Sequence, residues 1–276
     1  MSPVPNLVLN NGVEIPQLGF GVFKVPPEKT RQAVLTALET GYRHIDTAKL
    51  YDNETEVGAA VRDSGLMRDE IFVTTKVWNT DQGYDATLRA FDASMERLGL
   101  DVLDLYLIHW PAPARDLYVD TWRAMEQLYR DGRVRAIGVS NFQPDHLRRL
   151  LDRCDVVPVI NQVELHPYLQ QNEARKAHEE LGVLTEAWAP IARGGALLED
   201  PVITALADKH ARTPAQVVLR WHIEVGNVVI PKSVTPARVA ENFSIFDFTL
   251  DGADLAEIAA LDRGERTGPD PDRLNA

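Results

Sequence analysis

Four residues of types that carry out proton chemistry lie in the first half of the chain: Asp46, Tyr51, Lys76 and His109. Asp46, Lys76 and His109 each close a short run of β-branched and apolar residues, and Tyr51 follows shortly after Asp46. An isolated buried lysine loses its proton, whereas a carboxylate at hydrogen-bonding distance keeps it charged. We therefore expect Asp46 to pair with Lys76 wherever the fold brings the two runs together.

A charged Lys76 next to Tyr51 is expected to change the acidity of the phenol. A nearby cation lowers the pKa of a tyrosine from its usual value of about 10, which would make Tyr51 a usable proton donor near neutrality. A neutral His109 would add a hydrogen-bond donor. This set of groups suits the protonation of a carbonyl oxygen on which negative charge develops.

These residues belong to a regular alternation of strand-like and helix-like segments. Amphipathic stretches predict helices at 28–41, 54–65, 83–99, 118–131, 144–153, 171–182 and 213–225. Short apolar runs predict eight strands, at 17–22, 43–47, 71–76, 104–109, 134–140, 158–164, 183–188 and 227–231.

Eight strands alternating with helices in about 250 residues predict a parallel (β/α)₈ TIM barrel, with a doubly wound eight-stranded sheet as the main competitor. Residues 6–15 read as a β-hairpin around Asn11-Gly12 that would close the bottom of a barrel. In a barrel the carboxyl ends of the strands share one face. Asp46, Lys76 and His109 would then lie side by side.

Further segments surround this repeating unit. Residues 196–210 predict an extra helix, 236–262 predict two more near the C-terminus, and 263–276 read as a loop. Thr30, Asp52 or Asn53, and Thr213 are expected to begin helices. Glycines and prolines are scattered rather than gathered into a linker, so we expect residues 1–276 to form a single domain.

Composition narrows the class of protein. Hydrophobic residues make up 45% of the chain and charged residues 25%, as in ordinary globular proteins. The formal net charge of −12 disfavours nucleic acid as a partner. No apolar run approaches the ~20 residues of a membrane span, and the first residues lack the features of a signal peptide. The lone Cys154 cannot form an internal disulfide. We expect a cytoplasmic monomer.

Several common motifs are absent or broken. In Gly19-Phe-Gly21-Val-Phe-Lys24, lysine stands where a dinucleotide fingerprint needs its third glycine. Residues 226–233 imitate a phosphate-binding loop, but Pro231 replaces a glycine and offers no N–H. The sequence contains no His-Glu-x-x-His, no paired cysteine ligands and no Gly-x-Ser-x-Gly. We expect no metal site.

Longer motifs resemble the aldo-keto reductase family, in order and at the family's spacing, over residues 7–272. The likeness is greatest to the bacterial 2,5-diketo-gluconate reductase-like branch. The motifs are Gly41-Tyr-Arg-His-Ile-Asp46-Thr-Ala, Leu107-Ile-His109-Trp-Pro, Val139-Ser-Asn141-Phe, Asn161-Gln162-Val-Glu-Leu-His-Pro and Ile230-Pro-Lys232-Ser233-Val-Thr-Pro.

The resemblance implies a catalytic tetrad and a set of cofactor contacts. Asp46, Tyr51, Lys76 and His109 would act on a small carbonyl substrate beside the nicotinamide of NADPH, with Tyr51 as the acid. Hydride would come from nicotinamide C4. The cofactor contacts implied are Ser140, Asn141 and Gln162 at the carboxamide, Trp188 stacked on the ring, Lys232, Ser233 and Arg238 at the 2′-phosphate, and Glu241 and Asn242 at the adenine.

Two places depart from the family's pattern. Residues 188–192, Trp-Ala-Pro-Ile-Ala, replace the usual aromatic-Ser-Pro-Leu-Gly and leave the pyrophosphate contacts open. Lys49 and Asp52 replace small residues beside the tyrosine and would alter the pocket mouth. Trp78 and Trp110 follow two strands and are candidates for the walls of an apolar substrate pocket.

Other interpretations remain open at this point. Asp46 and Lys76 alone would fit a structural ion pair, and Trp188 alone would fit a core residue. The alternative function is a nucleotide-bound redox sensor or regulatory subunit with little turnover. A metal-dependent barrel hydrolase would need clustered histidine and carboxylate ligands, and the sequence shows no such cluster.

Overall fold

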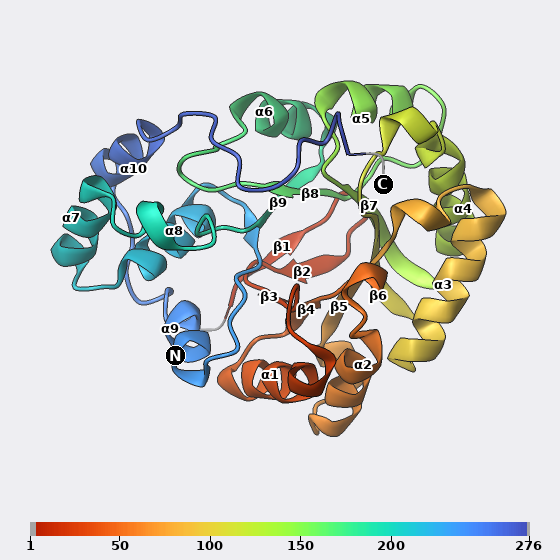
Figure 1. The fold of residues 1–276 in the computed structure, drawn as a ribbon, viewed down its shortest axis with the longest axis horizontal. Helices are drawn as coiled ribbons and strands as arrows, with labels where there is room; N and C mark the ends of the chain where they lie inside the picture. The colour runs from red at the N-terminus through yellow and green to blue at the C-terminus, as the bar shows by residue number, and fades with distance from the viewer. Residues whose placement is uncertain (1–3, 275–276) are drawn as a thin grey trace.

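Eight parallel strands form a ring in the computed structural model, which describes residues 4–274 (Figure 1). Neighbouring strands follow the chain, from β3 at one end of the ring to β10 at the other. A bridge between Leu18 and Val229 and a 3.1 Å hydrogen bond from Gly21 N to the oxygen of Pro231 join these two ends. The strands are β3 (Phe20–Gly21), β4 (His44–Asp46), β5 (Phe72–Val77), β6 (Leu103–Ile108), β7 (Val134–Ser140), β8 (Ile160–Glu164), β9 (Leu184–Trp188) and β10 (Val228–Val229).

Helices surround this ring on the outside (Figure 1). Most of the buried apolar side chains pack between the helices and the strands. The helices are α1 (Pro27–Thr40), α2 (Glu54–Asp63), α3 (Tyr84–Leu98), α4 (Tyr118–Arg130), α5 (Pro144–Leu151), α6 (Asn172–Leu181), α7 (Pro201–His210), α8 (Pro214–Glu224), α9 (Pro236–Phe243) and α10 (Gly252–Ala259). The (β/α)₈ barrel is confirmed, as are the extra helices α7, α9 and α10.

A hairpin of β1 (Asn6–Val8) and β2 (Glu14–Pro16) covers one end of the barrel. Leu9 and Ile15 are buried against side chains of the barrel interior such as Leu105. Asn10 Nδ2 donates to the carbonyl of Pro158, which precedes β8. The hairpin therefore closes the end where the strands begin, as the sequence predicts, and leaves the carboxyl ends of the strands open.

Helix boundaries follow the expected signals at most places. Thr213 caps α8 through a 3.3 Å bond from Gln216 N to its hydroxyl, and Asn53 precedes α2. The expectation that Thr30 begins a helix is wrong. Helix α1 begins at Pro27, because proline suits the first position of a helix, and the Thr30 hydroxyl instead donates to the carbonyl of Pro26.

The segment after Arg263 contains no helix or strand over 264–274, as expected, and residues 275–276 lie outside the described part. It runs across the open end of the barrel beside α5 and α6 (Figure 1).

Among residues 4–274 no helix has the length and apolar character needed to cross a membrane. In the same range, no group of three His, Cys, Asp or Glu side chains is arranged to hold a metal.

Candidate active site

Strands β4, β5 and β6 bring three of the predicted catalytic residues together at the open end of the barrel. Lys76 Nζ lies 2.7 and 2.8 Å from the two carboxylate oxygens of Asp46 and 3.0 Å from the carbonyl oxygen of Thr47. Lys76 is fully buried. Because a buried ammonium group needs such partners, these bonds account for a charged lysine inside the barrel.

Tyr51 and His109 complete this cluster. Tyr51 ends a short 3₁₀ turn, Lys49–Tyr51, and its hydroxyl lies 3.5 Å from Lys76 Nζ. The rings of Tyr51 and His109 meet edge to face, with centroids 5.6 Å apart. The four residues that the sequence singles out are therefore neighbours in space.

The acidity of Tyr51 differs from the expectation. Burial raises its pKa to about 12, although Lys76 acts in the opposite direction. The predicted lowering of this pKa is therefore wrong, because the sequence shows the neighbouring cation but not the loss of solvent. Burial alone would lower the pKa of Lys76, yet Asp46 and Tyr51 outweigh it and the net shift is upward. The cluster thus holds a protonated phenol beside a charged lysine.

His109 is held in its neutral form. Burial, and then the positive charge of Lys76, lower the pKa of this imidazole well below its usual value. Its Nδ1 atom is buried and has no hydrogen-bond partner in residues 4–274. The nearby indole of Trp78 meets the imidazole edge to face, with ring centroids 5.1 Å apart. A neutral imidazole can donate one hydrogen bond without adding a second positive charge.

Ser140, Asn141 and Trp188 form a hydrogen-bonded group beside the tetrad. Asn141 Nδ2 donates to the carbonyl of His109 at 2.9 Å and to the Ser140 hydroxyl at 3.0 Å. Trp188 Nε1 donates to Asn141 Oδ1 at 2.8 Å. The indole of Trp188 is only half-buried. It is thus fixed at one edge and keeps part of its surface free for a contact.

Gln162 bridges two buried carboxyl groups. Its Nε2 donates to Asp46 Oδ2 at 2.8 Å and to Glu186 Oε2 at 3.0 Å. Both amide hydrogens are therefore committed, and only Oε1 remains to accept a bond from a ligand. Sequence reasoning missed Glu186. A charged residue inside an apolar strand run, Leu-Thr-Glu-Ala-Trp, was the signal that could have revealed it.

Glu186 differs from Asp46 in its protonation. It is fully buried, and burial, followed by the charge of Asp46, raises its pKa to about 8. Its Oε1 has no hydrogen-bond partner among the described residues and lies 3.9 Å from His44 Nε2. Burial also lowers the pKa of His44 to about 4. Lys76 is thus paired with one carboxylate, Asp46, while Glu186 is neutral near pH 7.

The predicted phosphate-binding residues lie after β10 and at the start of α9. Lys232 and Arg238 are exposed, and neither forms an ion pair with a carboxylate of residues 4–274. Thr235 precedes α9 without a side-chain capping bond, so the first N–H groups of that helix remain available. Ser233 Oγ accepts a 3.2 Å bond from Thr235 N.

The predicted adenine contacts belong to the same helix. Asn242 is buried, and Glu241 is half-buried and accepts a 2.8 Å hydrogen bond from the Thr213 hydroxyl. Lys232, Ser233, Arg238, Glu241 and Asn242 therefore lie close in the chain around the start and the end of α9. Their contacts with a nucleotide stay a prediction.

The mouth of the site is bounded by two short 3₁₀ turns. Lys49, next to Tyr51, forms an ion pair with Asp81 of the turn Asn79–Asp81, which follows Trp78. The unusual lysine in this sequence thus links the turn that carries Tyr51 to the turn that follows Trp78. Trp110 is buried and meets Trp188 edge to face, with centroids 6.4 Å apart. Trp78 and Trp110 thus border the cluster, and their role as pocket walls stays a prediction.

The loop after β9 has an unusual backbone. Ala189, Ala192 and Arg193 have positive φ angles of 48°, 49° and 61°. Such angles are unfavourable for residues with a Cβ. Ala192 stands at the position where the family pattern has glycine. Ala192 therefore keeps the left-handed backbone conformation that glycine would adopt more easily.

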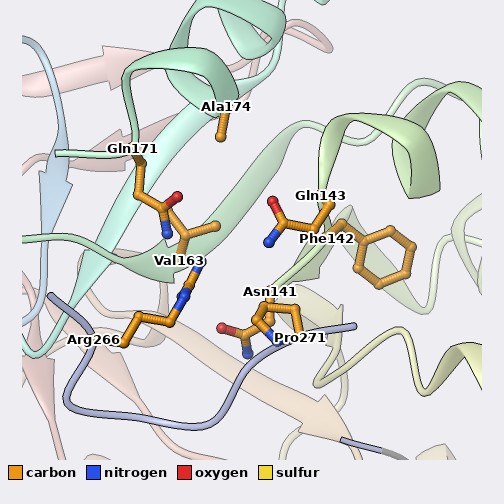
Figure 2. A pocket seen from close by; sticks show the side chains of 8 residues that line it. All are labelled: Asn141, Phe142, Gln143, Val163, Gln171, Ala174, Arg266 and Pro271. Atoms are coloured by element: carbon orange, nitrogen blue, oxygen red, sulfur yellow. The ribbon is translucent and has the colours of Figure 1, made fainter. Parts of the chain in front are cut away.

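A narrow pocket lies beside Asn141, at the edge of this site. It is too narrow to enclose a water molecule and is bounded on one side by the C-terminal segment, through Arg266 and Pro271. Figure 2 shows Pro271 next to Asn141, with the Arg266 side chain extending toward Val163. The C-terminal segment is therefore part of the surroundings of the predicted cofactor contacts.

Comparison with known proteins agrees with this geometry. The family model described as "Aldo/keto reductase family" matches residues 17–263. The chain belongs to this family. An aldo-keto reductase of Mycolicibacterium smegmatis is 57% identical over 98% of each chain.

Two further relatives are informative about activity and cofactor. The glyoxal reductase of Bacillus subtilis is 52% identical over 96% of each chain. A variant of Gox0644, solved in complex with NADPH, is 48% identical over 99% of each chain, with a TM-score of 0.95. The aldo-keto reductase family, the barrel fold and an NADPH-dependent carbonyl-reducing enzyme, all predicted from the sequence, are confirmed.

Proposed function

We propose that this aldo-keto reductase reduces the aldehyde group of small dicarbonyl compounds, with Tyr51 as the proton donor. The observation that carries the proposal is the buried hydrogen-bond chain from Asp46 through Lys76 to the Tyr51 hydroxyl. The neutral ring of His109 lies beside it. This arrangement can stabilise a carbonyl oxygen that gains negative charge, because a phenol, a cation and a neutral hydrogen-bond donor converge on one point.

The proton comes from the Tyr51 hydroxyl. An alkoxide is a stronger base than a phenolate, so a phenol with a pKa of about 12 still protonates the reduced substrate. The phenolate left behind lies 3.5 Å from the Lys76 ammonium group, which stabilises it until solvent returns the proton. His109 orients the carbonyl oxygen by donating one hydrogen bond. NADPH, when bound, supplies the hydride to the carbonyl carbon.

The residues present fit NADPH. Two exposed cations, Lys232 and Arg238, have no carboxylate partner in the described chain, which suits them to a 2′-phosphate. The N–H groups at the start of α9 can add to this contact. Trp188 offers a half-exposed indole to the nicotinamide ring. Oε1 of Gln162, together with Ser140 and Asn141, would bind the carboxamide.

A small dicarbonyl substrate is supported by two observations. The glyoxal reductase of Bacillus subtilis shares half of its residues with this chain. The Lys49–Asp81 ion pair links the turn that carries Tyr51 to the turn that follows Trp78, and Trp78 and Trp110 provide apolar surface. A mouth narrowed in this way favours compact substrates over large ones.

The same proposal covers organisation and location. We expect one domain over residues 1–276, because the family model and the barrel both extend across most of the chain. The acidic composition supports a monomer with no nucleic-acid partner, and we expect this protein in the cytoplasm. A redox sensor with little turnover is not favoured, because the complete cluster of Asp46, Tyr51, Lys76 and His109 suits turnover.

The test is NADPH oxidation by the purified protein with glyoxal, methylglyoxal, a simple aliphatic aldehyde and a bulky steroid ketone. We expect the highest kcat/KM for the two dicarbonyls and the lowest for the steroid. NADPH binding without turnover of any carbonyl would support the sensor instead. A preference for the steroid would contradict the assignment of the substrate class.

A further inference from the structure

Glu164 is a buried carboxylate that ends β8 at the open face of the barrel, outside the tetrad. It is fully buried. Its Oε1 accepts 2.6 Å bonds from both the backbone N–H and the hydroxyl of Thr267, and its Oε2 accepts a 3.0 Å bond from Gly268 N. His166 Nε2 lies 3.2 Å from Oε1. Glu164 therefore holds the C-terminal segment by three of its hydrogen bonds.

These bonds keep the carboxylate charged inside the protein. In residues 4–274 no lysine or arginine forms an ion pair with Glu164. Burial alone would raise its pKa, but the bonds from His166, Thr267 and Gly268 lower it to about 2. Hydrogen bonds to an ionised acceptor are about twice as strong as neutral ones. Glu164 therefore stays ionised near neutrality, and its contact with the C-terminal segment is strong.

The segment held by Glu164 packs against Trp188. Residues 164 and 188 are paired neighbours in β8 and β9. A Cβ atom added to Gly268 would lie 2.4 Å from Cη2 of Trp188, so only glycine fits against the indole. The N–H group of the same indole donates to Asn141 Oδ1. The C-terminal segment, the indole and the Asn141 amide thus form one continuous line of contacts.

We propose that Glu164 is a positioning residue for the cofactor site. It holds residues 266–268 against Trp188, and this contact fixes the indole and the Asn141 amide where the nicotinamide is bound. Figure 2 shows that the same segment, through Pro271, also lies beside Asn141. The inference rests on the proposed contacts of Trp188 and Asn141 with the nicotinamide.

Three variants interrupt this line at different points. Glu164→Gln replaces one acceptor oxygen by an amino group, which faces an N–H donor. Thr267→Val removes one hydroxyl bond and leaves Glu164 in place. Gly268→Ala places a methyl group 2.4 Å from the indole and 2.9 Å from Glu164 Oε2, so it pushes on both partners of the segment. Thr267→Ser keeps the hydroxyl, and Gly252→Ala, at a glycine with no atom within 4 Å of an added Cβ, is the matched control.

The measurements are the Kd for NADPH, the quenching of tryptophan fluorescence on binding, and the separate kcat and KM values. We expect Glu164→Gln and Gly268→Ala to weaken NADPH binding about tenfold or more, which corresponds to about 1.4 kcal/mol, and to reduce the quenching. Thr267→Val should give a smaller effect. Thr267→Ser and Gly252→Ala should stay within about twofold of wild type. If Glu164→Gln does not fold, Gly268→Ala and Thr267→Val decide the question.

Two results would overturn the inference. Normal Kd and quenching in Glu164→Gln and Gly268→Ala, with only the melting temperature lowered, would show that Glu164 serves stability alone. Unchanged quenching in Trp188→Phe would show that the indole does not contact the nicotinamide, and the positioning role would fall with it. In either case, carbonyl reduction by the wild-type protein would still stand on its own assay.

Discussion

Two buried glutamates at the barrel mouth should respond to pH in opposite ways, and Glu186→Gln tests this directly. Glu186 has a pKa of about 8 because it is buried near the Asp46 charge. In the unfolded chain its pKa returns to about 4.3. Between these values the folded protein holds a proton that the unfolded chain has lost. The free energy of unfolding therefore falls as the pH rises through this window.

The size of the effect follows from linkage. One proton contributes a slope of at most about 1.4 kcal/mol per pH unit. Glutamine keeps an acceptor for Gln162 Nε2 and removes the titration. We therefore expect the unfolding free energy of Glu186→Gln to gain ~2–3 kcal/mol relative to wild type between about pH 5 and about pH 7. His44, Asp46 and Lys76 face Glu186 and are present in both proteins, so the difference isolates the glutamate.

Urea unfolding of both proteins at several pH values provides the assay, with Glu164→Gln as the control. The pKa of Glu164 is lowered to about 2, so its contribution is lost only as the pH falls below about 4.5. The difference between Glu164→Gln and wild type should therefore stay constant across the same range. A constant difference for Glu186→Gln as well would refute the claim that Glu186 is a neutral acid in the folded protein.

Two other changes address the cofactor site and the loop after β9. Replacing both Lys232 and Arg238 by alanine should remove most of the preference for NADPH over NADH, because charge-assisted bonds to a phosphate contribute about 1.5–3 kcal/mol each. The ratio of kcat/KM for the two cofactors measures this preference. An unchanged ratio in the double variant would reject the phosphate contact. Ala192→Gly should raise the unfolding free energy by up to about 1 kcal/mol, because Ala192 has a φ of 49°. The control Ala205→Gly, at an exposed position in the middle of α7, should lower the unfolding free energy by about 1 kcal/mol. A comparable loss in Ala192→Gly would show that the loop is not strained.

Much of the barrel could be predicted because each strand is bounded by local signals. The range predicted for β7, 134–140, agrees with the structure at both ends, since Gly132 and the polar pair Ser140-Asn141 mark the limits of the apolar run. β10 is shorter than predicted, Val228–Val229 rather than 227–231. Proline at 231 has no N–H for a neighbouring strand, so regular pairing ends before it.

That Asp46, Tyr51, Lys76 and His109 are neighbours could be predicted for a similar reason. Asp46, Lys76 and His109 stand at the carboxyl ends of consecutive strands, and the barrel places such ends on one face. The pKa of Tyr51 could not be predicted, because it depends on how much solvent the fold removes from around the phenol. Glu164 and Glu186 were missed because their partners come from distant parts of the chain. Glu164 accepts a hydrogen bond from the backbone N–H of Thr267, whereas Glu186 accepts one from the side-chain amide of Gln162.

Whether Tyr51 donates the proton can be measured with the variant Tyr51→Phe. Phenylalanine keeps the ring beside Lys76 and His109 and removes only the hydroxyl. With saturating NADPH and methylglyoxal, kcat should fall by about 10²–10⁴-fold while the Kd for NADPH is unchanged, as expected for the loss of a positioned general acid. Turnover within about tenfold of wild type would contradict the assignment.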